Sequence, residues 1–384
     1  MKKILSALLA GLMICTLCLA GCNEAPAVDT TPVETELTET DAPDAEVPAK
    51  GIAVEDLKVA FLYVGPIGDL GYSYAHDQGR LAIEKEFGIK THYVENVPET
   101  AECETQLRQL CEEGYNVIYA TSFGYGEWVE KVAADYPNVY FGHATGYIVG
   151  ENYGNYMGRV YEARYLAGIV AGLNTESNKI GYVAAMPIAE VIRGINAFTL
   201  GVRSVNPEAT VEVIWTNTWF DLALEKTAAQ TLIANGCDVM AQHCDSTAPQ
   251  LAAQEAGIKA IGYNTSTPTA APKAYMTAPL FHWGVYYTQD IQKIVDGTWE
   301  GATYWEGLSA GMVSLDTLTD NCVEGTAEAV AAAQEKIANG EIVIFKGEIK
   351  DNTGAVKVAA DQVLTDAELT SLDWLVEGVI GSIN

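Results

Sequence analysis

The segment KVAFLYVGPIGDLGYSYAHDQGR, residues 58–80, decides how the rest of the chain is interpreted. Its first part is mostly apolar and is typical of a buried strand, and residues 74–87 have the pattern of a helix. The turn between them contains three glycines, a proline and Asp69, and is followed by Tyr72 and Tyr74. A strand, a Gly-rich turn and a helix are typical of the start of a parallel α/β sheet, and ligands bind such sheets at these turns.

The same alternation of strand and helix continues along the chain in two series. The first series predicts strands at 58–64, 90–96, 116–122 and 138–145, and helices at 74–87, 100–113 and 126–136. A long amphipathic helix is predicted at 159–173. The second series then predicts strands at 179–186, 210–217, 238–244, 259–264 and 275–283, and helices at 191–204, 222–235, 247–256 and 286–296. Strands joined by single helices imply parallel sheets, so two similar α/β domains are expected.

The first residues are predicted to lie outside the fold. Residues 1–21 have a basic start and an apolar run, which is typical of a secretory signal peptide. The run ends in Leu19-Ala20-Gly21-Cys22, which looks like a bacterial lipobox, so Cys22 is expected to carry lipid. A plain signal peptide with an incidental cysteine is the alternative. Residues 22–55 follow as an acidic tether rich in Pro and Thr, which would leave the protein exported and lipid-anchored to the outer face of the cytoplasmic membrane.

The charge of the chain excludes one class of partner. The 384 residues carry a formal net charge of −29, and removing residues 1–21 takes away two lysines and no acid. A nucleic-acid partner would require a basic surface that displaces counterions from phosphates. We therefore expect no nucleic acid as a partner and contact with the membrane through the lipid anchor only.

The loops that follow the predicted strands contain the candidate ligand contacts. They combine aromatic side chains with amide and carboxylate groups, and they contain almost no Lys or Arg. The candidates are Asp69, Tyr72, Tyr74, Ser122, Phe123, Trp219, Phe220, Asp245, Asn264 and Trp283. Aromatic faces stack on flat rings, an ionised Asp accepts from N–H groups, and an Asn can both donate and accept. This set predicts a flat, neutral, nitrogen-rich ligand.

Structural roles for the same residues stay open. Tyr72 and Tyr74 could pack at the start of a helix. Trp219 and Phe220 could fill space between the domains. Asp69 and Asp245 could cap the helices that follow them, and for Asp221 the capping role is preferred. Capping and ligand binding are compatible for Asp69.

Motifs of catalysis and of cofactor binding are absent from the sequence. Gly65, Gly68 and Gly71 have the spacing GxxGxxG rather than GxGxxG. The glycine motif that is typical of dinucleotide-binding domains is therefore absent. No phosphate-binding P-loop and no GxSxG nucleophile elbow occurs, and the five His are scattered. We expect no catalytic residues, no metal and no cofactor, and we expect that the protein is not an enzyme.

Several motifs together resemble one family. They are Asp69, Tyr72 and Gly79 in the first loop, YLAG at 165–168, KIGYV at 179–183, VNPE at 205–208, WFD at 219–221 and GYN at 262–264. With the lipobox and the tether, this combination resembles the basic membrane protein family of ABC-transporter substrate-binding lipoproteins, which includes purine nucleoside receptors. The resemblance implies an ABC permease as partner, a monomer and the type I periplasmic binding protein fold. This is an α/β fold of two Rossmann-like parallel-sheet domains joined by a multi-crossing hinge.

The resemblance also implies domain boundaries and a ligand. The N-terminal lobe would comprise 56–156 and 284–318, and the C-terminal lobe 157–283 and 319–384, with hinges near 154–158, 283–284 and 315–319. Stacking contacts carry over to Tyr72 and Phe220, and polar base contacts to Asp69 and Asn264. The family's usual Phe-Asn pair is Tyr72-Ser73 here, and the HDQGR run at 76–80 is similar to a subgroup associated with adenine.

Two bulky side chains favour a free base over a nucleoside. Trp219 or Trp283 could fill the space that a ribose would occupy, whereas Asp245 could serve ribose hydroxyls. A purine nucleobase is therefore the expected ligand, and adenine is the favoured one. A purine nucleoside, or a sugar or signalling molecule bound by the same fold, is the alternative.

Overall fold

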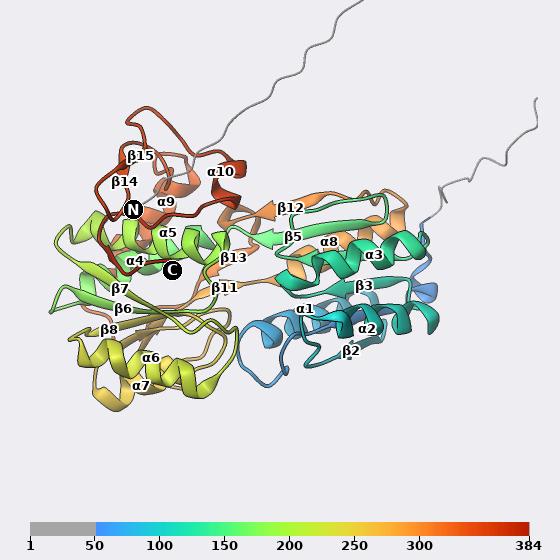
Figure 1. The fold of residues 1–384 in the computed structure, drawn as a ribbon, viewed down its shortest axis with the longest axis horizontal. Helices are drawn as coiled ribbons and strands as arrows, with labels where there is room; N and C mark the ends of the chain where they lie inside the picture. Colours follow the sequence, from blue (N-terminus) through green and yellow to red (C-terminus); the bar gives the residue numbers. More distant parts are fainter. Residues whose placement is uncertain (1–50, 384) are drawn as a thin grey trace, which may run out of the picture. The chain divides into compact units, whose positions relative to one another are not determined.

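The computed structural model of the chain describes residues 51–383 (Figure 1). The predicted signal peptide, Cys22 and the tether up to residue 50 lie outside the described residues. A short 3-10 helix, η1 (Val54–Asp56), precedes the first strand. Within the described part, no helix combines the length and the apolar character that crossing a membrane requires.

The first lobe is a six-stranded parallel sheet covered by helices on both faces (Figure 1). Its strands are β1 (Val59–Leu62), β2 (Thr91–Val94), β3 (Val117–Ala120), β4 (Tyr140–Ala144), β5 (Tyr153–Gly158) and β12 (Thr303–Glu306), in the spatial order β12-β5-β4-β3-β1-β2. Helices α1 (Tyr72–Phe87) and α8 (Trp283–Asp296) cover one face, and α2 (Ala101–Glu112) and α3 (Gly126–Asp135) cover the other. Alternate residues of β1 face opposite cores, so all four of its residues are buried.

The second lobe repeats this architecture. Its strands are β6 (Lys179–Ala184), β7 (Thr210–Trp215), β8 (Val239–His243), β9 (Lys259–Ile261), β10 (Tyr275–Thr277) and β16 (Val379–Ile380), in the order β10-β9-β8-β6-β7-β16. Helices α4 (Val160–Asn174), α5 (Ala189–Val205) and α9 (Thr326–Ala338) share one core, and α6 (Leu222–Ala234) and α7 (Ala248–Ala256) share the other. The predicted α/β fold of two parallel-sheet domains is confirmed.

The chain passes between the lobes more than once. It leaves the first sheet at the end of β5 and enters α4. It returns through β11 (Pro279–Phe281) into α8, and β12 pairs with β5 before β13 (Val313–Leu315) pairs antiparallel with β11. The chain therefore crosses between the two sheets after β5, before α8 and after β12. The hinge positions and the residue boundaries of the domains stay predictions.

The C-terminal region forms elements that the sequence pattern did not predict. They are the pair β14 (Ile349–Lys350) and β15 (Val356–Val358), helix α10 (Asp366–Thr370) and β16. Arg193 of α5 donates from Nη1 to the carbonyl oxygen of Leu369 at 2.7 Å. Arg159, at the crossing from β5 to α4, forms an ion pair with Asp366 at 2.5 Å. These contacts attach the C-terminal region to the second lobe and to the crossing.

Several predicted elements differ from the structure. Helix α1 begins at Tyr72 rather than at residue 74, because Asp69 caps its first backbone amides. Residues 153–156 form part of strand β5 rather than of a loop. The strand predicted at 275–283 is two short strands in different sheets, β10 and β11.

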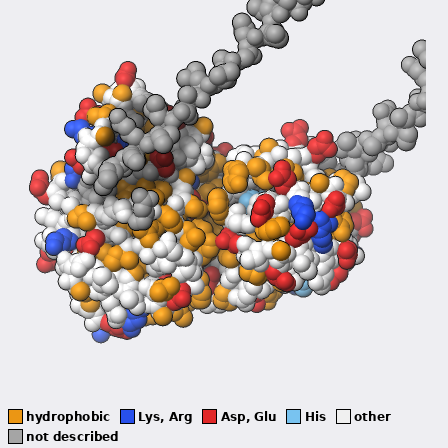
Figure 2. All heavy atoms as spheres, in the orientation of Figure 1, with side chains coloured by type: hydrophobic (Ala, Val, Ile, Leu, Met, Phe, Trp, Pro, Cys, Tyr) orange, Lys and Arg blue, Asp and Glu red, His pale blue; other side chains and the backbone are white. Residues whose placement is uncertain are grey.

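Acidic side chains lie across the visible face of the molecule with few Lys or Arg among them (Figure 2). This distribution agrees with the net charge of −29. A dispersed negative charge favours solubility and disfavours binding to polyanions.

Candidate ligand-binding site

Asp69 organises the first strand-to-helix turn. Its Oδ1 accepts from the backbone N–H of Gly71 at 2.8 Å and of Tyr74 at 3.0 Å, and its Oδ2 accepts from Ser73 N–H at 3.0 Å. Burial raises the pKa of Asp69, and these backbone donors oppose that rise. Because both carboxylate oxygens are used in this way, Asp69 acts as a cap that positions Tyr72 at the first residue of α1.

Gly71 allows the two lobes to approach closely. A Cβ atom at this position would collide with the backbone carbonyl of Asp245 in the second lobe. Next to it, the hydroxyl of Thr265 donates to the carbonyl oxygen of Leu70. The turn after β1 therefore contacts the loop after β8 directly, and only glycine fits at the point of contact.

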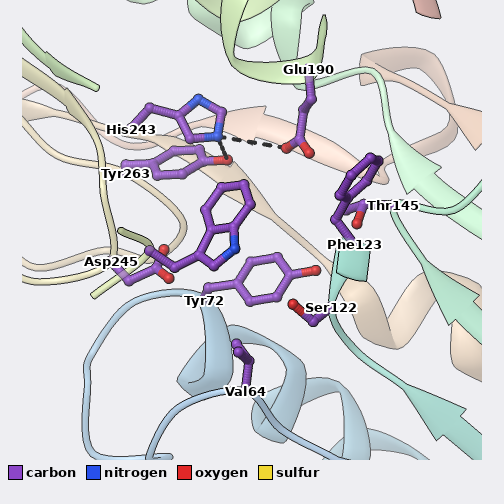
Figure 3. Close-up of a pocket in the computed structure, with 10 residues that line it drawn as sticks. Val64, Tyr72, Ser122, Phe123, Thr145, Glu190, His243, Asp245 and Tyr263 are labelled. Atoms are coloured by element: carbon purple, nitrogen blue, oxygen red, sulfur yellow. Dashed lines mark hydrogen bonds and ion pairs between the residues drawn. The ribbon is translucent and has the colours of Figure 1, made fainter. Parts of the chain in front are cut away.

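Side chains from both lobes enclose a small inner compartment (Figure 3). Each residue lies at or beyond the carboxyl end of a strand, and each lobe contributes five. The lining residues are Val64, Tyr72, Ser122, Phe123, Thr145, Glu190, Trp219, His243, Asp245 and Tyr263. The space not filled by atoms is about 340 Å³, including some open solvent. Most of it is too narrow for a water molecule, and the centre of a water molecule can occupy only about 20 Å³. The lobes are thus closed around a space about as large as one water, and a larger ligand must separate the aromatic side chains.

Tyr72 is the aromatic side chain that α1 presents to this compartment. Its hydroxyl is inaccessible to solvent and has no hydrogen-bond partner among the described residues. The Tyr72 ring packs edge-on against His76, with centroids 4.4 Å apart, and His76 stacks on Trp283 at 4.2 Å. Trp283 is buried, packs edge-on against Tyr72 with ring centroids 6.2 Å apart, and does not line the compartment.

Asp245 lies in the loop after β8 and is held by Asn264. Asn264 Nδ2 donates to Asp245 Oδ1 at 3.2 Å, while Oδ2 has no partner in the part of the chain that the structure describes. Burial, followed by the charges of Asp69 and Glu225, raises the pKa of Asp245 well above its usual range. The environment therefore favours the protonated acid, which can donate one hydrogen bond and accept others.

Glu99 connects the two lobes beside the compartment. Its Oε1 accepts from the Ser122 hydroxyl at 2.6 Å and from Gly124 N–H at 2.7 Å. Its Oε2 faces the indole N–H of Trp219 in the second lobe at 3.4 Å. Glu99 lies in the loop after β2, which was not among the loops predicted to contact the ligand.

His243, Tyr263 and Glu190 form a polar group, and none of the three was predicted as a ligand contact. His243 Nε2 lies 3.1 Å from the Tyr263 hydroxyl and 3.6 Å from Glu190 Oε1. Burial lowers the pKa of His243 to about 4, so its imidazole is neutral at neutral pH. The guanidinium of Arg164 lies 3.9 Å from the centre of the Tyr263 ring and supports that ring.

The structure brings together half of the predicted site residues. Tyr72, Ser122, Phe123, Trp219 and Asp245 line the compartment. Asp69 and Asn264 position these residues and do not line it. Tyr74, Phe220 and Trp283 lie outside the lining as well. Asp221 caps α6 by accepting from the N–H groups of Ala223 and Leu224, as expected.

An outer compartment adjoins the inner one and shares Phe123, Thr145 and Glu190 with it. About 470 Å³ of this larger space can hold the centre of a water molecule. Its remaining lining residues are Gly146, Tyr147, Asn155, Met157, Ile188, Ala189, Arg193, Thr303, Tyr304, Trp305 and Thr370. The cleft between the lobes thus has a closed inner part and an open outer part.

Comparison with known proteins identifies sequence relatives. Residues 56–348 match the family described as "ABC transporter substrate-binding protein PnrA-like". A protein of Haloferax volcanii, provisionally named as an ABC transporter glucose-binding protein, is 40% identical over 362 residues, which cover 94% of this chain and 89% of that protein. A purine-binding protein of Brucella abortus is 38% identical over 329 residues, covering 85% of this chain and 94% of that protein.

Solved structures with low sequence identity share the fold. A solute-binding protein of an ABC transporter from Conexibacter woesei superposes with a TM-score of 0.63 at 20% identity, covering 75% of this chain and 98% of that one. Another from Aeropyrum pernix superposes with a TM-score of 0.64 at 22% identity, covering 77% and 93%.

Proposed function

Because the chain belongs to the PnrA-like family of ABC transporter substrate-binding proteins, we propose that it binds a purine base, adenine first, in the inner compartment between its lobes. Proteins of this family bind a small-molecule ligand for a membrane permease and are binding proteins rather than enzymes. The substrate class of this chain, its lipid anchor and its monomeric state belong to the proposal.

The composition of the inner compartment carries the proposal. Four aromatic side chains line it, namely Tyr72, Phe123, Trp219 and Tyr263. Its ionisable lining residues are Glu190, Asp245, the neutral His243 and the two tyrosines, and neither Lys nor Arg lines it. Aromatic side chains stabilise a stacked heterocycle by about 1–3 kcal/mol each. A flat, uncharged ring with N–H groups on its edge matches these walls, and the purine-binding relative is consistent with such a ligand.

Asp245 would read the amino edge of the base. As a protonated acid, it would accept from the exocyclic amino group with its carbonyl oxygen and donate its proton to the adjacent ring nitrogen. Asn264 would hold the carboxyl group in place through the contact to Oδ1. Adenine has the required donor and acceptor side by side.

Closure of the lobes would enclose the base. The inner compartment is nearly filled when Gly71 meets Asp245, so the base would enter while the lobes are apart. The bound base would then keep the aromatic side chains separated. The closed form is the one expected to dock on the permease.

A sugar is the second candidate ligand. The relative with 40% identity is provisionally named as glucose-binding, which favours a hexose. Sugar sites also stack rings, but they usually add Arg and several Asp around the hydroxyl groups. The inner compartment has two carboxyl groups and no Arg, which favours the purine.

Thermal-shift screening against adenine, adenosine and glucose tests the proposal. A ligand at about one hundred times its dissociation constant adds ~2.7 kcal/mol to the free energy of unfolding, which is readily measured. We expect adenine to raise the melting temperature at the lowest concentration of the three. A shift in melting temperature with glucose alone would indicate that the ligand is a sugar and not a purine.

The lipid anchor at Cys22 is testable in cells. The full chain should incorporate labelled palmitate and remain with the membrane fraction, because lipid on Cys22 would hold the tether there. Cys22→Ala should remove the label and release the folded protein. Label that persists in Cys22→Ala would refute the anchor without affecting the ligand proposal.

A further inference from the structure

The inner and outer compartments share three lining residues. They are Phe123, Thr145 and Glu190, and we call these three side chains the partition. The Thr145 hydroxyl donates to the carbonyl oxygen of Ala144, and Phe123 is apolar. Glu190 is therefore the ionisable member of the partition.

Glu190 presents a carboxylate that the protein uses little. It lies in the first turn of α5, and its side chain is 11% exposed. Its closest polar contact among the described residues is His243 Nε2 at 3.6 Å, too long for a good hydrogen bond. Figure 3 shows the carboxylate pointing into the inner compartment, across it from Asp245. Glu190 thus has free acceptor capacity at the end of the compartment that borders the outer space.

The neighbouring imidazole supplies no positive charge to Glu190. His243 is neutral at neutral pH because burial lowers its pKa to about 4. After burial, the charge of Glu190 is the largest cause that raises the pKa of Tyr72. Tyr72 and Glu190 therefore face the same space, and a ligand N–H placed there would meet the carboxyl oxygens of Glu190 (Figure 3).

We infer that Glu190 selects free purine bases against purines substituted at N9. This inference rests on the proposed function. With the amino edge of the base on Asp245, the N9–H lies on the far side of the ring system and donates to Glu190. A substituent at N9 removes this donor and must displace Glu190 to reach the outer compartment.

The size of the outer compartment makes Glu190 the residue on which exclusion of nucleosides depends. Its space of about 470 Å³ is large enough for a ribose, so the volume beyond the partition does not exclude nucleosides. Exclusion instead depends on the Glu190 carboxylate between the two spaces. Shortening this side chain should connect the compartments and admit the larger ligand.

Binding of three probes to the wild-type protein tests the inference without any mutation. Isothermal titration calorimetry would compare adenine, 9-methyladenine and adenosine. A hydrogen bond to a charged group contributes about 1.5–3 kcal/mol, so both substituted purines should bind at least ~10-fold more weakly than adenine. Equal affinity for adenine and 9-methyladenine would overturn the inference while leaving the purine function intact. Failure of all three to bind would instead refute the proposed function.

Two variants and a matched control complete the experiment. In Glu190→Ala, we expect weaker adenine binding and stronger adenosine binding, so that their ratio changes by at least ~10-fold. In Glu190→Gln, which keeps the size of the side chain, adenine should weaken and adenosine should remain excluded. Glu127→Ala removes an exposed glutamate from the first turn of α3 and should change neither affinity. An unchanged adenine-to-adenosine ratio in both Glu190 variants would overturn the inference.

Discussion

Tyr72→Ala is expected to lower the affinity for adenine by ~100-fold or more. The substitution removes an aromatic wall, worth about 1–3 kcal/mol in a good stack. It also removes a buried hydroxyl that has no partner within the described residues and faces the inner compartment. Isothermal titration calorimetry with adenine measures the loss directly.

Two further variants separate the ring from the hydroxyl and from general damage. Tyr72→Phe keeps the ring, so it should bind adenine within ~10-fold of the wild type. Tyr74→Ala removes a half-buried tyrosine from the same turn of α1, but Tyr74 does not line the compartment, so affinity should change by less than ~3-fold. An equal loss in Tyr72→Ala and Tyr74→Ala would show that the helix, and not the Tyr72 side chain, matters.

Asp245→Ala should weaken adenine binding strongly, whereas Asp245→Asn should change it little. Alanine leaves the amide of Asn264 without its partner and removes the edge contact to the base, so the adenine affinity should fall by ~30-fold or more. Asparagine retains one acceptor and one donor, as the protonated acid does, so its affinity should stay within ~5-fold of the wild type. A large loss in Asp245→Asn would mean that the acid works in its ionised form.

The pH dependence of the wild type follows from the raised pKa of Asp245. The folded protein holds the Asp245 proton more tightly than the unfolded chain does. The contribution of Asp245 to the free energy of unfolding therefore decreases as the pH rises through the pKa that Asp245 has in the folded protein. Adenine affinity should decrease over the same range, because ionisation removes the donor. Both decreases should be weaker in Asp245→Asn, as measured by calorimetry and thermal unfolding across pH.

The central strands and helices could be predicted because local sequence decides them. In β1, four consecutive apolar residues are buried on both faces, and the Gly-rich turn and α1 follow directly. Strand β5 was missed because its sequence, YGNYMG, has the composition of a loop. Its glycines are needed for close packing, since a Cβ on Gly154 would crowd the backbone of Ala302 and one on Gly158 would crowd Phe281 and Val313.

The edge strands depend on distant parts of the chain and could not be read locally. Strand β12 joins the first sheet beside β5, and β16 joins the second sheet beside β7, each after a long excursion. Neither has a strong periodic pattern, and both are short. Their positions follow from the crossing of the chain between the lobes, which sequence spacing does not indicate.

The sequence predicted the location of the candidate site better than it predicted which residues line the site. Inspecting the loops after strands found Tyr72, Phe123, Trp219 and Asp245, because the carboxyl ends of parallel strands converge. Glu190 was missed because only residues 186–188 were considered as the loop after β6, and Glu190 lies two residues beyond them, within the first turn of α5. Asp69 was placed correctly in the turn, yet its oxygens are taken by backbone amides, which depends on a geometry that composition does not reveal.

A crystal structure of the protein with adenine would show where and how the base binds. We predict the base in the inner compartment, stacked against aromatic side chains that include Tyr72, with its amino group within hydrogen-bond distance of Asp245 and its N9 facing Glu190. A base bound elsewhere on the chain, or a hexose occupying this compartment in preference to adenine, would contradict the account.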